Sequence, residues 1–152
     1  MTVEVQIASD CAGLPDATQL TQWVNVAIEQ RKGADVVVRI VDEPESAELN
    51  ARYRQKDGAT NVLSFPFEAP EWMPEEVLTD DILGDLVICA PVVIREAIAQ
   101  DKPVLAHWAH MVVHGCLHLQ GYDHIDPEQA DIMETIEIKL LNSMAIRNPY
   151  EG

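Results

Sequence analysis

"VLAHWAHMVVHGCLHLQGYDH", residues 104–124, contains all 5 histidines of this 152-residue chain. Pro103 stands directly before this stretch, and proline suits the first turn of a helix. Gly121 can adopt the left-handed conformation that commonly ends a helix. We therefore predict a helix over residues 104–120, followed by a turn that leads the chain to His124.

Four segments outside this helix have the pattern of β-strands, namely residues 3–9, 35–42, 60–68 and 81–90. The first alternates Val3, Val5 and Ile7 with polar residues, as a half-buried strand does. The second is a continuous apolar run, which favours a place inside the sheet. Proline cannot donate a hydrogen bond to a neighbouring strand, so Pro66 favours an edge position for the third.

Four further helices are expected, over residues 16–33, 44–54, 91–100 and 127–144. The first is expected to continue until Gly33, and the last is amphipathic, with Ile132, Ile136 and Leu140 on one side. Residues 69–80 are expected to form a loop. The predicted fold class is therefore α+β: a small mixed β-sheet of about four strands packed with about five helices, one of which carries the histidines.

The length and charge of the chain limit the classes of protein to which it can belong. A chain of 152 residues is expected to form a single domain, residues 1–152. With 10 basic and 26 acidic side chains its net charge is −16, which argues against non-specific adhesion to polyanions. Arg52, Arg54 and Lys56 are the exception, because they lie within five positions. Any contact with nucleic acid is therefore expected to be local.

The location of the protein is inferred from what its sequence lacks. The first residues have no signal-peptide pattern, and no segment reaches the roughly 18 apolar residues of a membrane helix. Cys11, Cys89 and Cys116 have no metal-site spacing and cannot all be paired, which fits free, buried thiols in a reducing compartment. We therefore expect a cytoplasmic protein without a membrane partner.

The spacing of three histidines predicts a metal site. His114 and His118 are four residues apart, so both imidazoles lie on one helix face and can bind the same ion. A third ligand has to return from outside the helix, and His124 follows the turn at Gly121. The spacing H-x3-H-x5-H with this glycine is that of the zinc site of metzincin peptidases. Three protein ligands leave one zinc position open, as in catalytic sites.

Gly115 distinguishes this sequence from those peptidases. In them the residue after the first histidine is a glutamate that acts as general base. The sequence therefore predicts the metal site without the peptidase base, and a metzincin-like metallopeptidase is a disfavoured alternative.

Neighbouring residues are predicted to support the site rather than to bind the metal. His107 lies about 10 Å from His114 along the helix axis, too far to share its ion. His110 is expected to be buried and hydrogen-bonded beside the site, and Asp123 to orient an imidazole rather than to act as a fourth ligand. Cys116 faces away from the two helical histidines.

At this point the sequence resembles the YbeY family of bacterial endoribonucleases, also described as rRNA maturation factors. The resemblance is carried by "HGCLHLQGYDH" (114–124), "YRQKDGATNVLSFPFE" (53–68) and "LGDLVIC" (83–89), and it extends over most of the chain. It implies a single zinc ion (Zn2+) bound by His114, His118 and His124. It also implies that the functionally important arginine of the family corresponds to Arg54.

The resemblance implies a single-strand-specific endoribonuclease that matures the 3′ end of 16S rRNA and takes part in ribosome quality control. The expected partners are rRNA, the small ribosomal subunit and a ribosome-associated protein, and not DNA. Zinc lowers the pKa of bound water to about 7 and polarises phosphoryl oxygens, and Arg54 can make a two-pronged contact with a phosphate. The general base stays open: zinc-activated water or a substrate 2′-hydroxyl could be the nucleophile.

Two further alternatives remain open from the sequence. One is a non-enzymatic ribosome-assembly factor in which zinc is structural. The other concerns "TNVLSFPF", which either forms a wall of the zinc cleft or contributes Val62, Leu63, Phe65 and Phe67 to the core. Because the net charge of −16 opposes binding of naked RNA, the ribosome or a protein partner is expected to supply much of the affinity.

Overall fold

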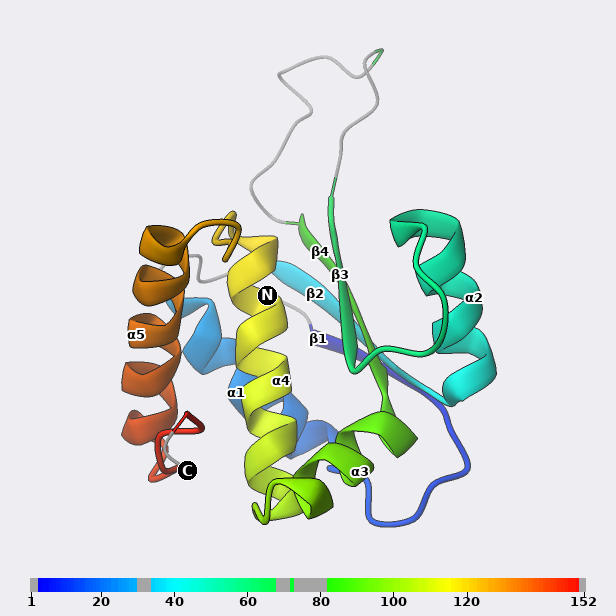
Figure 1. Ribbon diagram of the computed structural model, residues 1–152, viewed down its shortest axis with the longest axis horizontal. Helices are drawn as coiled ribbons and strands as arrows, with labels where there is room; N and C mark the ends of the chain where they lie inside the picture. The colour runs from blue at the N-terminus through cyan, green and yellow to red at the C-terminus, as the bar shows by residue number, and fades with distance from the viewer. Residues whose placement is uncertain (1–2, 30–33, 68–71, 73–81, 151–152) are drawn as a thin grey trace.

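The computed structural model describes residues 3–29, 34–67, 72 and 82–150 (Figure 1). Within them the strands are β1 (Val3–Ala8), β2 (Asp35–Val41), β3 (Val62–Pro66) and β4 (Ile82–Cys89). The helices are α1 (Ala17–Ala27), α2 (Glu43–Arg54), α3 (Ala90–Ala99), α4 (Val104–Leu119) and α5 (Pro127–Ser143). This set of elements confirms the predicted α+β fold.

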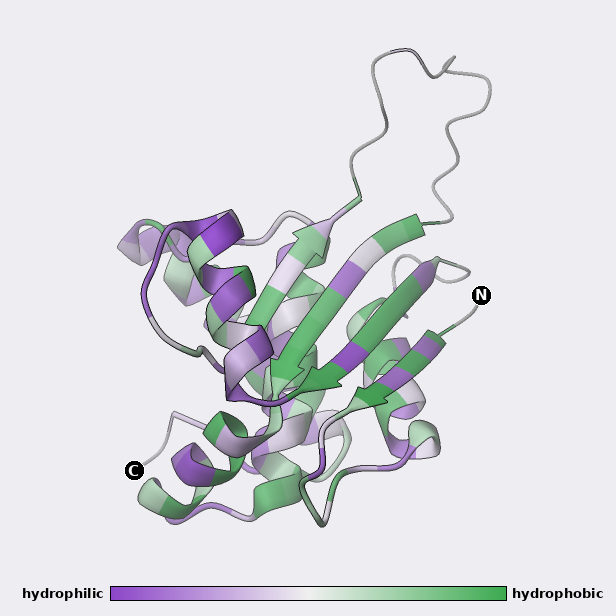
Figure 2. Cartoon of the chain, turned by 90° about the vertical axis from the view of Figure 1, so that its right-hand side faces the viewer, coloured by the Kyte–Doolittle hydropathy of each residue, from purple (hydrophilic) through white to green (hydrophobic). Residues whose placement is uncertain are grey.

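The four strands form one mixed sheet in the order β1-β2-β4-β3. β1 pairs with β2 and β2 with β4 in parallel, whereas β3 runs antiparallel to β4. β2 lies inside the sheet and β3 at its edge, as the apolar run of β2 and Pro66 in β3 predict. Figure 2 shows the strands side by side, with hydrophobic residues concentrated along β4 and β2.

The helices cover the two faces of the sheet unequally. α2 covers one face, over a small cluster formed by Val41, Leu63, Val87 and Cys89. On the other face α4 contacts β3 and β4 directly and packs against α1, α3 and α5 (Figure 1). Eleven of the 16 residues of α4 are buried, which explains why its sequence is apolar nearly all round. Among the described helices, none is both long enough and apolar enough to cross a membrane.

Three details of the prediction are wrong or cannot be compared. α1 ends at Ala27 rather than continuing to Gly33, because Ile28 already has a non-helical backbone. Ile7 is 54% exposed, since it lies on the edge strand β1, which the helical layer covers only partly. The predicted loop over 69–80 lies outside the described residues, except for Trp72. Residues 30–33, at the end of the predicted first helix, also lie outside them.

The face of α5 that packs inward also differs from the prediction. Ile132 is 50% exposed, whereas Met133, Glu137 and Leu141 are the buried residues of this helix. The buried face is therefore centred one position later than the isoleucines and leucine indicate. A hydrophobic pattern could not show this, because the central residue of that face is a glutamate.

The cysteines give a first test of the packing. All three are free, and Cys89 and Cys116 are buried while Cys11 is half-buried. Burial raises the pKa of Cys116 to about 12, and the reactive form of a thiol is the thiolate. In the native protein at pH 8, a chromogenic disulfide reagent is expected to modify Cys11 quickly and the two buried thiols only after denaturation. Fast modification of Cys116 in the native protein would contradict the packing of α4.

Candidate metal centre

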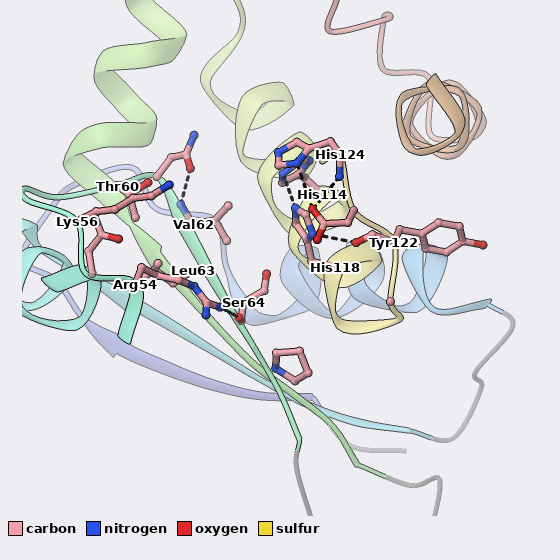
Figure 3. A pocket seen from close by; sticks show the side chains of 15 residues that line it. Arg54, Lys56, Thr60, Val62, Leu63, Ser64, His114, His118, Tyr122 and His124 are labelled. Atoms are coloured by element: carbon pink, nitrogen blue, oxygen red, sulfur yellow. Dashed lines mark hydrogen bonds and ion pairs between the residues drawn. The ribbon is translucent and has the colours of Figure 1, made fainter. Parts of the chain in front are cut away.

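The three histidines predicted as zinc ligands lie together near the C-terminal end of α4 (Figure 3). His114 and His118 come from successive turns of the helix, and His124 from the loop after it. The ring centroid of His114 lies 4.6 Å from that of His118 and 5.5 Å from that of His124. One ligand atom from each residue lies within 4.8 Å of the other two.

Hydrogen bonds determine which nitrogen of each helical imidazole is free. Nδ1 of His118 lies 2.9 Å from the carbonyl oxygen of Tyr122, which can only accept, so this nitrogen carries the proton. Nδ1 of His114 lies 2.6 Å from a carboxylate oxygen of Glu137 and likewise donates. In its neutral form each ring therefore has its lone pair on Nε2.

The two Nε2 atoms of His114 and His118 lie only 3.1 Å apart. Two lone pairs at this distance repel each other unless a cation lies between them. Burial lowers the pKa of His118, and the neighbouring His114 lowers it further, which favours the neutral, metal-binding form of this ring. Neutral imidazoles with converging lone pairs are what a zinc ion requires, and this donor set fits zinc.

The loop after α4 brings in the third imidazole. Gly121 has a φ of 99°, in the left-handed region that glycine adopts without strain. The N–H of Tyr122 then donates to the carbonyl of Leu117, which closes the end of the helix. Asp123 accepts the backbone N–H of His124 and lies 3.4 Å from Nδ1 of its ring. Asp123 therefore lies where it can orient His124, the role that the sequence predicts for it.

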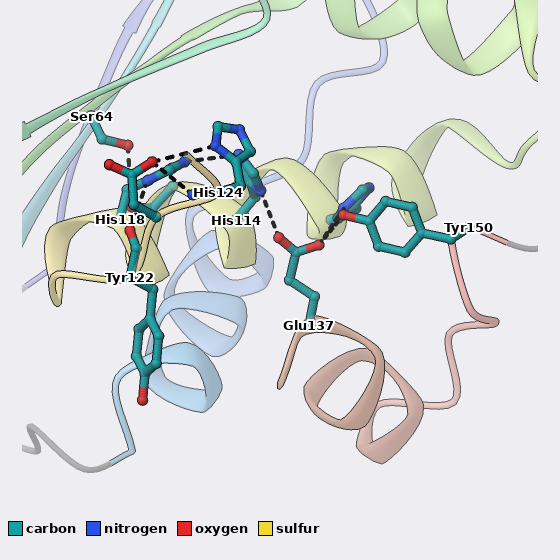
Figure 4. Close-up of polar contacts among 10 residues, drawn as sticks. Ser64, His114, His118, Tyr122, His124, Glu137 and Tyr150 are labelled. Atoms are coloured by element: carbon teal, nitrogen blue, oxygen red, sulfur yellow. Dashed lines mark hydrogen bonds and ion pairs between the residues drawn. The ribbon is translucent and has the colours of Figure 1, made fainter. Parts of the chain in front are cut away.

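Glu137 of α5 is the residue of this centre that the sequence analysis did not identify. Its side chain is completely buried, and its Oε1 accepts the hydrogen bond from Nδ1 of His114 (Figure 4). Its Oε2 lies 2.9 Å from Nε2 of His110 and accepts a further hydrogen bond from the hydroxyl of Tyr150. His110 is thus buried and hydrogen-bonded beside the site, as expected, whereas His107 bonds to Glu96.

The carboxyl group of Glu137 is ionised despite its burial. Burial by itself raises the pKa of a carboxyl group, but the hydrogen bonds from His110, His114 and Tyr150 together lower that of Glu137 to about 2. Burial raises the pKa of the Tyr150 hydroxyl, and the adjacent carboxylate raises it further, so the phenol stays protonated and donates. A buried carboxylate with three hydrogen-bond donors is therefore a stable part of this centre.

A second group of residues, His110, His114 and Glu137, also has its ligand atoms within 4.8 Å of one another. The three side chains are already joined by direct hydrogen bonds through the two oxygens of Glu137, and two of the residues are buried. A metal among them would have to replace those bonds. The trio that includes His118 and His124 instead opens onto a pocket, so it is the better metal site.

The pocket has a volume of about 550 Å³ and lies between α4, its following loop, β3 and the end of α2 (Figure 3). The three histidines line one wall. Arg54 and Lys56 line another, on the side of α2. One wall can thus hold a cation and the other offers two fixed positive charges. A phosphate group is complementary to both.

Contacts with β3 hold the side chain of Arg54 in place. Its Nη2 donates to the carbonyl of Ser64, and its Cζ lies 5.4 Å from the centroid of the Phe65 ring. These contacts use only part of the guanidinium group, which has five N–H donors. Donors therefore remain for a ligand in the pocket.

β3 serves both roles that the sequence left open. Val62, Leu63, Ser64 and Pro66 line the pocket, so this edge strand is one of its walls. Leu63 is also 5% exposed and belongs to the small core under α2. Phe67, which the core alternative included, is 42% exposed. A single strand can do both because its successive side chains point to opposite faces.

Gly115 is required by the packing of α4 on the sheet. It is buried, and a Cβ atom there would lie 2.7 Å from Cδ2 of Leu86 and 3.2 Å from Cγ2 of Val62. The hydroxyl of Ser64 donates to the carbonyl of Gly115, so the helix and β3 are in direct contact. A glutamate at this position, as in the peptidases, would require the side chains of Leu86 and Val62 to shift.

Gly115→Ala is expected to destabilise the protein by about 1–3 kcal/mol, because Leu86 is fully buried and cannot move freely. Urea unfolding monitored by tryptophan fluorescence measures this change. Gly58→Ala is a control for the general cost of replacing glycine, since no atom lies within 4 Å of a Cβ there, although its φ of 88° adds strain. An equal or higher midpoint for Gly115→Ala than for the wild type would show that the contact is not tight.

Comparison with known proteins identifies close relatives. The family model described as Endoribonuclease YbeY matches residues 10–145. A curated protein of that name from Methylococcus capsulatus is 58% identical over 146 residues, 96% of this chain and 93% of the relative. Another, from Alcanivorax borkumensis, is 54% identical over 151 residues, 98% of this chain and 86% of the relative.

Among solved structures, the fold is similar to the solution structure of TM1509 from Thermotoga maritima. The TM-score is 0.54 at 23% sequence identity, and the match covers 97% of this chain and 99% of the other. At this identity the likeness concerns the fold alone.

Proposed function

This chain belongs to the Endoribonuclease YbeY family, and on that basis we propose that it is a zinc-dependent endoribonuclease that cuts single-stranded RNA. One observation carries the zinc dependence: the lone pairs of His114 and His118 converge beside His124 at the wall of an open pocket. The proposal treats residues 1–152 as one catalytic domain. The large core cluster, which includes Leu86, Trp108 and Val112, and the small core under α2 both pack against the same sheet, which supports that view.

The proposed ligands of the zinc ion are His114, His118 and His124. When bound, zinc supplies Lewis acidity, which stabilises the negative charge that develops at the phosphate and makes water easier to deprotonate. The chain itself keeps the ligands in the right state: the carbonyl of Tyr122 holds the proton of His118 on Nδ1. The opening of the site onto a pocket supports a catalytic role over a structural one.

Arg54 is the proposed phosphate-binding residue. The planar guanidinium can bind two phosphate oxygens at once, and this geometry is most valuable in a transition state that carries extra negative charge. Lys56 lines the same wall and adds a second positive charge. The pocket of about 550 Å³ is of the size that encloses one small ligand, so it suits a phosphodiester of a flexible single strand better than a double helix.

The biological substrate proposed for this activity is the 3′ end of 16S rRNA, with a further role in ribosome quality control. A chain with a net charge of −16 is repelled by RNA at long range. The small ribosomal subunit or a protein bound to it would therefore supply much of the affinity in the cytoplasm, with Arg52, Arg54 and Lys56 guiding the RNA locally. Because the net charge of −16 opposes binding of naked RNA, the alternative of a non-enzymatic assembly factor also has to be tested. The following experiment distinguishes it from a ribonuclease.

Removal of the metal tests the proposed activity. The zinc-loaded protein is expected to cut a single-stranded RNA oligonucleotide, to leave the same sequence intact as a duplex or as DNA, and to lose activity in a chelator. Added zinc is expected to restore cleavage. Cleavage that survives complete removal of the metal, measured on the same samples, would contradict the proposal. A folded protein with bound zinc and no cleavage would favour the assembly factor.

The same assay identifies the nucleophile. A single 2′-deoxy substitution at the cleavage position is expected to block cleavage if the adjacent hydroxyl attacks, and the normal product then ends in a cyclic phosphate. If water attacks, the substituted strand is still cut and no cyclic product forms.

A further inference from the structure

We propose that Glu137 is a positioning residue for the metal centre, and that Tyr150 of the C-terminal segment holds it in place. The carboxylate orients His114 and keeps its proton on Nδ1, so that Nε2 is presented to the metal. This inference rests on the proposed function in one respect, namely that His114 is a zinc ligand. It assigns a role to a segment of the chain that lies outside all three sequence motifs of the family.

The first argument is the cost of burying Glu137. Its side chain has an exposed fraction of 0%, and an ionised carboxylate is strongly destabilising in such a place unless hydrogen bonds compensate it. An apolar residue would fill the same position between Met133 and Leu141 without that cost. The benefit of a carboxylate at this position therefore lies in the hydrogen bonds that it accepts. Of the residues that donate them, His114 is the one that faces the pocket.

The second argument is that the two carboxylate oxygens of Glu137 have different hydrogen-bond partners. Among the described residues Oε1 accepts from Nδ1 of His114 alone, at 2.6 Å, whereas His110 and Tyr150 both approach Oε2 (Figure 4). Hydrogen bonds from His110 and Tyr150 thus hold one oxygen of the carboxylate, and the other oxygen points at the imidazole of His114. A carboxylate in this position fixes the tautomer and orientation of a metal-binding imidazole and raises its basicity.

The third argument concerns the C-terminal segment. After α5 ends at Ser143, the chain returns to the metal centre, and the ring of Tyr150 packs edge-on against that of His110 at 5.4 Å. Nζ of Lys102 donates to the carbonyl of Pro149, which ties the segment to the start of α4. The hydroxyl of Tyr150 is thus held in place to donate to Glu137. Loss of this contact should loosen the carboxylate without touching a ligand.

Zinc affinity, measured without RNA, tests this proposal separately from the proposed activity. In competition with a chromophoric chelator, Glu137→Gln is expected to weaken zinc binding by about 10- to 100-fold, and Tyr150→Phe by a smaller factor. Glu128→Gln, an exposed residue on the same helix, and Tyr53→Phe, a half-exposed tyrosine, are matched controls with unchanged affinity. Failure of RNA cleavage in the wild type would leave these expectations intact.

Nitrogen-15 NMR of the metal-free protein gives the signature that a purely structural role would not produce. His114 is expected as the Nδ1-protonated tautomer in the wild type and as a mixture of tautomers in Glu137→Gln. Unchanged zinc affinity and an unchanged His114 tautomer in folded Glu137→Gln would overturn the proposal. If that variant does not fold, the result rests on Tyr150→Phe, whose half-exposed ring loses only a hydroxyl, and wild-type zinc affinity there would overturn the proposal equally.

Discussion

His114→Ala and His118→Ala are each expected to abolish zinc binding at stoichiometric concentration and to lower RNA cleavage by about 10³-fold or more. A catalytic metal contributes several kcal/mol of transition-state stabilisation, and each 1.36 kcal/mol corresponds to a factor of about ten. Both residues offer Nε2 to the same point, 3.1 Å apart, so neither can replace the other. Metal content and initial cleavage rate, measured on the same samples, test this expectation.

His124→Ala should have a graded effect. Its ring is held by a loop and is 56% exposed, whereas those of His114 and His118 are oriented by hydrogen bonds to α5 and to the helix end. Two imidazoles on one helix still form a weak zinc site. Cleavage by His124→Ala is therefore expected to recover in part at high zinc concentration, while that of His114→Ala is not.

His107 provides the matched control on the same helix. It is buried and bonded to Glu96, so His107→Ala should lower stability but retain one zinc ion per chain. Zinc loss in this variant equal to that of His114→Ala would mean that the metal content reports folding rather than ligation. Wild-type cleavage by His114→Ala would place the activity elsewhere or in a contaminant.

The cluster of His114, His118 and His124 could be predicted from the sequence because it follows local rules. His114 and His118 are four positions apart on one helix, and Gly121 ends that helix wherever the helix packs. The position of β3 at the edge also follows from a local property, the missing N–H of Pro66. Such features depend little on residues far away in the chain.

Glu137 could not be found in this way, because its partners come from two other parts of the chain, α4 and the C-terminal segment. It is one of 26 acidic residues and lies in a helix whose apolar pattern points to a different face. The available signal is its flanks: Met133 and Leu141, four residues away on each side, are both buried. A glutamate between two apolar residues on the same helix face indicates a buried charge. The histidines of the predicted helix over residues 104–120 are the available partners for such a charge.

Arg54 is an intermediate case. The family resemblance selects it among the basic residues, but the contacts that hold its side chain come from β3. The left-handed residue Gln55 ends α2 directly after it, so Arg54 is the last helical residue before the chain turns toward the pocket wall. Sequence periodicity alone does not show that this helix end and the histidine helix line the same pocket.

Arg54→Ala is expected to lower RNA cleavage by about 10²-fold while leaving zinc affinity and folding unchanged. Arg54 is exposed, so its loss removes little packing, and the effect follows from the lost contact with developing phosphate charge. Steady-state kinetics with a short single-stranded RNA should place most of the loss in kcat rather than in KM.

Arg54→Lys separates charge from geometry. Lysine retains the positive charge but lacks the planar pair of donors, so we expect it to recover a minor part of the lost rate. Full recovery would mean that Arg54 acts as a simple charge, like Lys56 beside it. Arg52→Ala, on the same helix but not lining the pocket, removes a charge that guides RNA only from outside the pocket; as the matched control it should change cleavage by less than about threefold. A loss for Arg52→Ala as large as that for Arg54→Ala would indicate general attraction of RNA to the end of α2 rather than a contact in the transition state, and the assignment of Arg54 to the phosphate would then fail.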